Sequence, residues 1–124
     1  MGRQRTQGSK SSTRSGDELV DLASSPRRRH IFDGEVRSNG SYGGGHRPGT
    51  GFPNKSEFPA DCSDDRIMHE ISDIATDPSL AWRAGNRPGD IFVSGTRDGI
   101  DTEVLIRNNQ VCTGYPTNVV RNAP

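Results

Sequence analysis

The sequence predicts an α+β fold in which a small antiparallel sheet packs against one main helix. Three observations lead to this prediction. Apolar residues recur at helical spacing in one segment, 64–77; short runs of alternating apolar and polar residues follow it; and only 28% of the 124 residues are hydrophobic, so the core must be small. One helix followed by consecutive strands is typical of an α+β domain with the helix on one face of the sheet.

The chain begins with a basic segment. Residues 1–29 carry seven basic and three acidic groups, a net charge of +4, whereas residues 30–124 carry nine and thirteen, a net charge of −4. The first segment is rich in Ser, Gly, Arg and Gln, and such a composition cannot bury enough apolar surface to offset the entropy lost on ordering. We expect a disordered basic linker over 1–28, either plainly solvated or a tether for polyanions, and one folded domain over 29–124.

Two of the three histidines lie in or next to a segment that is rich in turn-forming residues. His30 follows the triple arginine, and residues 33–54 are mostly turn-forming, so we expect His30 and His46 on loops or short elements. Three glycines precede His46. Because glycine lets the backbone pass close to a ligand, we expect Gly45 to contact one.

The predicted helix at 64–77 has signals at both ends. Ser63 can cap its start, two aspartates follow, and Pro78 comes directly after its end. Its apolar face is made by Ile67, Met68, Ile71, Ile74 and Ala75. His69 shares a face with charged residues, so we interpret it as a surface histidine.

After the helix the pattern changes to period two. We expect three strands, at 91–93, 102–107 and 110–115, joined by turns at Asp98-Gly99 and at Asn108-Asn109.

The two cysteines and the apolar runs exclude some classes of protein. Cys62 and Cys112 are fifty positions apart and lack CxxC spacing, which argues against a zinc ribbon. They form either one disulfide or two free thiols, and we favour free thiols. No apolar run approaches the roughly 18 residues needed to span a bilayer, so we expect no membrane-spanning segment.

The polar residues favour acid/base chemistry on a phosphate. Cleavage of RNA by internal transfer needs a base for the 2′-hydroxyl proton, an acid for the departing 5′-oxygen, and a cation for the charge that develops on the phosphate. His30 and His46 supply the acid and base types. Lys55, the only lysine after the N-terminal segment, supplies a cation, for which Arg87 or Arg97 are alternatives.

Four motifs together carry a family resemblance. HIFDGEV at 30–36, GGGHRPG at 43–49, KSEFPADCSDDRI at 55–67 and CTGYP at 112–116, in this order and spacing, resemble the bacterial branch of the EndoU uridylate-specific endoribonucleases. The resemblance covers residues 29–118. One departure is Cys62, which stands where bacterial relatives usually have a tryptophan, and we interpret it as a packing change.

The resemblance implies a site and a mechanism. It implies the fold shared by small RNase toxins and metal-independent transesterification of the ribonuclease A type, which leaves 2′,3′-cyclic phosphate ends without any cofactor. His46 would be the base, His30 the acid, and Lys55 the cation that stabilises the pentavalent phosphate. Thr113 would bind the phosphate or base, and Tyr115 would stack on or orient a uridine.

The resemblance also implies a biological setting. Bacterial domains of this kind often form the C-terminal toxin module of large secreted proteins, including those of contact-dependent growth inhibition. We therefore expect a monomer that is secreted within a larger toxin, acts on RNA in the target-cell cytoplasm, and is inhibited by a cognate immunity protein. The RNA is either transfer RNA or a broader range of substrates.

Two other classes remain open at this point. A metal-dependent phosphodiesterase would use both histidines and a carboxylate such as Asp33 or Glu35, although no HxH or HxxxH spacing supports it. In a non-enzymatic binding module, the glycine loop would be a plain surface turn.

Overall fold

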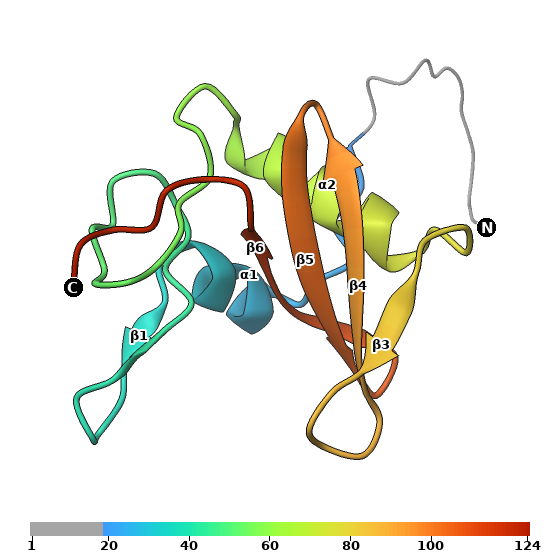
Figure 1. Ribbon diagram of the computed structural model, residues 1–124, viewed down its shortest axis with the longest axis horizontal. Coiled ribbons are helices and arrows are strands. Elements are labelled where there is room, and N and C mark those ends of the chain that lie inside the picture. Colours follow the sequence, from blue (N-terminus) through green and yellow to red (C-terminus); the bar gives the residue numbers. More distant parts are fainter. Residues whose placement is uncertain (1–18) are drawn as a thin grey trace.

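The computed structural model describes residues 19–124 of the chain, and Figure 1 shows the arrangement of its elements. Most of the expected linker therefore lies outside the described residues. The described part contains two helices and six strands, which are α1 (Ser25–Phe32), β1 (Glu35–Val36), β2 (Tyr42–Gly43), α2 (Asp64–Ala75), β3 (Trp82–Ala84), β4 (Asp90–Arg97), β5 (Ile100–Arg107) and β6 (Gln110–Pro116).

The fold begins earlier than the expected boundary at residue 29. The side chain of Ser24 caps α1, and Pro26 lies in its first turn, where a missing N–H costs nothing. Arg27, assigned to the linker from sequence, donates from Nε to the Cys112 carbonyl at 2.7 Å and so ties α1 to β6. Because this partner is 85 residues away, a run of arginines gave no local sign of it.

The main helix lies where the sequence places it. Ser63 accepts a hydrogen bond from the backbone N–H of Arg66 at 3.1 Å, as expected of a cap, and α2 ends at Ala75, two residues before the predicted end. The helix stops there because the next residues form a turn. In this turn the side chain of Asp77 accepts hydrogen bonds from the backbone N–H and the hydroxyl of Ser79. Its buried side chains, Ile67, Met68, Ile71 and Ile74, form the core together with apolar residues of α1 and the sheet.

The main sheet is antiparallel in the order β3-β4-β5-β6, so the predicted α+β class is confirmed. Two differences stand out. Strand β4 continues to Arg97 instead of ending at 93, and β3 was not expected. Residues 94–97 contain no large apolar side chain and β3 has only three residues, so their extended form rests on pairing with β5 and β4 respectively.

The two faces of the main sheet have different roles. Gly114 of β6 faces α2, where a side chain would meet Ile71. Because strand residues alternate between faces, Thr113 and Tyr115 point to the opposite face. Helix α1 contacts β6, and β1 lies on the other side of α1 in Figure 1; this corner holds the candidate site.

Cys62 and Cys112 are both free thiols, and Cys62 packs against the core. Neither helix within residues 19–124 has the length and apolar character needed to cross a membrane.

Candidate active site

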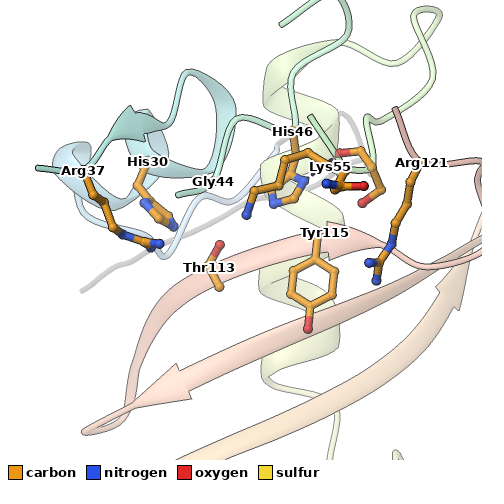
Figure 2. A pocket seen from close by; sticks show the side chains of 10 residues that line it. His30, Arg37, Gly44, His46, Lys55, Thr113, Tyr115 and Arg121 are labelled. Carbon is orange, nitrogen blue, oxygen red and sulfur yellow. Dashed lines mark hydrogen bonds between the residues drawn. The ribbon is translucent and has the colours of Figure 1, made fainter. Parts of the chain in front are cut away.

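One pocket of about 300 Å³ brings together five of the six residues singled out from sequence. They are His30, His46, Lys55, Thr113 and Tyr115, and Figure 2 shows their side chains around the same space. Gly45 does not line the pocket, but its neighbour Gly44 does. The residues that sequence analysis missed are Arg37, Gly44, Asn54, Ser56 and Arg121.

The backbone fixes the two histidines relative to each other. The last carbonyl groups of a helix have no hydrogen-bond partners within the helix. Here the backbone N–H groups of residues 45–47 supply those partners. The carbonyls of His30, Ile31 and Phe32 accept hydrogen bonds from the N–H groups of residues 45–47, at 3.1, 2.7 and 3.1 Å in chain order. His46 therefore sits directly against the end of the helix that carries His30.

The glycines permit this close approach. Gly44 has a φ of +61°, and a Cβ there would overlap the carbonyl of His30; Gly45 has a φ of +79°, and a Cβ would overlap the ring of Phe52. Both positions need glycine because the backbone conformation is left-handed and the space is filled. The loop brings backbone close to a helix end, whereas the sequence suggested approach to a ligand.

His46 is held in one tautomer. Its Nδ1 lies 2.6 Å from the carbonyl oxygen of Ser56, which can only accept, so Nδ1 carries the proton and Nε2 of the neutral ring is free to accept one. The residue is only 6% exposed, and this burial lowers the pKa of His46 to about 4. The positive charges of Lys55 and His30 lower that pKa further, against the opposing effect of the Ser56 bond. His46 is thus neutral at pH 7.

His30 has a different partner. Its Nδ1 lies 2.9 and 3.1 Å from the two carboxylate oxygens of Glu35 in β1. The carboxylate orients the ring and balances the positive charge of an imidazolium. Both histidines thus bind a fixed oxygen through Nδ1, but only His30 has a negatively charged partner.

Three cations line the pocket. Burial lowers the pKa of Lys55, and the neighbouring charges of Arg37 and Arg121 lower it too, although Glu35 acts in the opposite direction. The alternatives considered from sequence lie elsewhere. Arg97 binds Asp73 and Asp77 at 2.8 and 3.0 Å, and Arg87 is not among the pocket residues.

Strand β6 supplies the pocket floor. Thr113 lines the pocket, and its Oγ1 is buried and has no hydrogen-bond partner among the described residues. The ring of Tyr115 lies 5.5 Å from the ring of His46, and its hydroxyl donates to Glu103 at 2.5 Å. Burial and this carboxylate raise the pKa of Tyr115, so its phenol stays protonated.

The carboxylates considered for a metal site have other partners. Asp33 accepts from Arg47 at 3.0 Å, and Glu35 binds His30. Over residues 19–124, no three His, Cys, Asp or Glu side chains are grouped so that they could hold one metal ion. The third histidine, His69, lies outside the pocket, where its Nδ1 accepts from the backbone N–H of Val20 at 3.0 Å.

Comparison with known families places part of the chain in one of them. A family described as bacterial EndoU nuclease matches residues 50–118, slightly more than half of the chain. This range contains Lys55, Thr113 and Tyr115, while the two histidines precede it. Neither the curated proteins nor the solved structures gave a significant match.

Proposed function

Because the chain belongs to the bacterial EndoU nuclease family, we propose that its pocket cleaves RNA endonucleolytically at uridine, by transferring the phosphate to the neighbouring 2′-hydroxyl without a metal ion. One observation carries this proposal. The bond from His46 Nδ1 to the Ser56 carbonyl leaves a buried, neutral Nε2 beside a second histidine that is paired with a carboxylate. A proton acceptor and a proton donor therefore share one pocket.

In the first half of the reaction, Nε2 of His46 removes the proton from the 2′-hydroxyl of the uridine ribose. The 2′-oxygen then attacks phosphorus. Since the pKa of His46 is about 4, the imidazole is unprotonated at neutral pH and its Nε2 can accept the proton, but it is a weaker base than an ordinary imidazole.

In the second half, the bond from phosphorus to the 5′-oxygen breaks, and His30 donates the Nε2 proton to that oxygen. Glu35 keeps the ring in place and balances its charge before the transfer. The products are a 2′,3′-cyclic phosphate and a free 5′-hydroxyl.

The other pocket residues would bind the base and the phosphate and stabilise the charge that develops on the phosphate. Lys55 stabilises the added negative charge on the pentavalent phosphate. Thr113 offers the only buried hydroxyl oxygen among the described side chains that lacks a partner, and we assign it to the uracil or the phosphate. The fixed ring of Tyr115 offers a face for stacking on the base.

The experiment is incubation of the purified chain with a uridine-containing oligonucleotide in excess EDTA, followed by analysis of the fragment ends. We expect cleavage 3′ of uridine that leaves a 2′,3′-cyclic phosphate. Cleavage that requires an added divalent ion would instead support a metal-dependent phosphodiesterase, and an inert chain would support a binding module.

We further propose that the domain acts as the toxin module of a larger secreted protein, as in contact-dependent growth inhibition. It would act as a monomer on RNA in the target-cell cytoplasm, with transfer RNA as a substrate, and a cognate immunity protein would cover the pocket. The support is the family and the small, self-contained site. Expression in a bacterial cytoplasm should stop growth with cleaved transfer RNA, whereas His46→Ala should not; normal growth with the unaltered chain would contradict this role.

A further inference from the structure

We propose that Arg37 and Arg121 bind the two phosphates that flank the cleaved one, Arg37 on the 3′ side and Arg121 on the 5′ side. This inference rests on the proposed function, because it extends the same pocket to neighbouring nucleotides. It assigns a binding role to two residues that no sequence motif singled out.

Arg37 lies beside His30. It follows β1 directly, and its backbone N–H donates to the Ser41 carbonyl at 2.7 Å, which closes the hairpin between β1 and β2. Glu35 links the two side chains, with one carboxylate oxygen 2.9 Å from His30 Nδ1 and the other 3.9 Å from Arg37 Nη2. The Arg37 side chain is 52% exposed, so its guanidinium can still reach a ligand in solvent.

Arg121 lies at the other end of the pocket. The next residue, Asn122, donates from its backbone N–H to the Lys55 carbonyl at 2.9 Å, and from its side chain to Phe52 and Glu57 at 2.9 and 2.8 Å. These bonds fasten the C-terminal segment to the segment that carries Lys55. In Figure 2 the guanidinium of Arg121 lies beyond Lys55 and Tyr115, on the side opposite Arg37.

The pocket holds more positive charge than one phosphodiester needs. Three of the nine basic side chains in residues 30–124 line it, and no carboxylate does. Both arginines lower the pKa of Lys55, which is a sign of mutual repulsion. Neither Lys55 nor Arg121 takes part in an ion pair within residues 19–124. RNA relieves this repulsion because it places one phosphate at every nucleotide along the strand.

The proton transfers set the direction of the strand. His30 protonates the departing 5′-oxygen, so the nucleotide 3′ of the cut lies on the His30 side, and its next phosphate faces Arg37. His46 accepts the proton of the uridine ribose, and the uridine lies against Tyr115. The phosphate on the 5′ side of that uridine then faces Arg121.

The test compares three substrates that differ only in terminal phosphates. The dinucleoside monophosphate UpA carries only the cleaved phosphate, pUpA adds one on the 5′ side, and UpAp adds one on the 3′ side. For the unaltered full chain we expect each added phosphate to raise kcat/KM by roughly two- to fivefold, the effect of an exposed ion pair, mainly through KM.

The variants then assign each phosphate to an arginine. Arg37→Gln should lose the gain from the 3′ phosphate and keep the gain from the 5′ phosphate, and Arg121→Gln should do the opposite. Arg87→Gln, which removes the same charge away from the pocket, should keep both gains. Each gain is a ratio to UpA for the same variant, so an altered fold or base rate cancels.

Four outcomes would overturn the inference. Equal rates for the three substrates with the unaltered chain would exclude flanking phosphate sites while leaving the proposed function intact. Gains that persist in both variants would assign the phosphates to other residues, and exchanged losses would reverse the strand direction. No cleavage of any of the three would overturn the proposed function and this inference with it.

Discussion

At the scale of single residues, the two pocket histidines differ in burial and in what their Nδ1 atoms bind. A carbonyl holds His46 and a carboxylate holds His30. Burial keeps His46 neutral and the carbonyl partner fixes its proton on Nδ1, while the carboxylate partner balances the charge of a protonated His30. Two chemically identical side chains thus become suited to opposite proton transfers, which is the pairing that internal transfer requires.

This pairing predicts how the three histidines respond to substitution. His30→Ala and His46→Ala should each lower the cleavage rate by roughly 10²- to 10⁴-fold, because each removes a proton-transfer group. His69→Ala is the matched control and should leave the rate within about twofold. Initial rates on a uridine oligonucleotide, with circular dichroism to verify folding, measure the difference; an equal loss in His69→Ala would refute the assignment.

The low pKa of His46 also predicts how stability depends on pH. The unfolded chain has the ordinary histidine pKa of 6.5 and the folded chain has about 4, so between these values the unfolded state binds more protons. Stability from this group is complete above about pH 6.5 and falls as the pH drops toward 4. Near pH 5 the loss relative to neutral pH should be about 2 kcal/mol.

The measurement is urea unfolding of the parent chain and of His46→Gln near pH 7.5 and near pH 5. The variant should lose less free energy of unfolding between the two pH values, by that same 2 kcal/mol or so. Other titrating groups cancel in this comparison. An identical pH dependence in both proteins would mean that His46 titrates normally.

At the scale of elements, the end of α1 is completed by the loop that carries His46. Gly44 must have a left-handed backbone and lies where a Cβ would overlap the His30 carbonyl, whereas Gly49 has a φ of +92° with open space around it. Gly49→Ala should cost roughly 1 to 2 kcal/mol of stability from backbone strain alone. Gly44→Ala should cost about 1 to 3 kcal/mol more, because the loop must move off the helix.

Unfolding midpoints and cleavage rates of these two variants measure both effects. Only Gly44→Ala should also lose activity, since moving the loop separates the two histidines. Equal stabilities and equal rates in the two variants would show that the contact between the loop and α1 does not hold the site.

A second element, the C-terminal segment, fastens the loop that carries Lys55. Asn122 and Asn118 each make side-chain hydrogen bonds to turns, Asn122 beside the pocket and Asn118 at the turn between β4 and β5. Each change to alanine should cost about 1 kcal/mol of stability. Only Asn122→Ala should also lower kcat, and loss of kcat in Asn118→Ala would point to a global cause instead.

At the scale of the whole molecule, a third of the basic side chains of residues 30–124 lie in the pocket. Residues 30–124 carry a net charge of −4, yet three cations meet in one pocket. Binding of RNA should therefore depend on few ionic contacts and on the pocket rather than on a broad basic surface.

This distribution predicts a shallow salt dependence. For a short uridine oligonucleotide, the logarithm of 1/KM against the logarithm of salt concentration should have a slope of about −2, since each of three neutralised phosphates contributes roughly −0.7. Replacing both Arg37 and Arg121 with glutamine should reduce the slope to about −0.7. A slope steeper than about −5 for the parent chain would indicate that a larger basic surface, such as the N-terminal segment, binds the RNA.

The sequence by itself determined the features that depend on a residue and its near neighbours in the chain. The capped, amphipathic α2, the turns at 98–99 and 108–109, and the strands β5 and β6 follow from local spacing and turn chemistry. The residue types for acid/base chemistry on a phosphate are equally visible, since His30, His46 and Lys55 line one pocket. Thr113 and Tyr115, which the family resemblance added, line it too.

The features that depend on partners far along the chain were decided only by the tertiary structure. Strand β3 and the second half of β4 exist because of their neighbours, and α1 is held by Cys112 and by the loop at 45–47. The presence of Lys55, Arg37 and Arg121 in the pocket, and the position of Arg97 away from it, follow from which segments fold together. The physical reason is that a side chain's charge state and reach are set by the groups that surround it in space, and local sequence does not encode those neighbours.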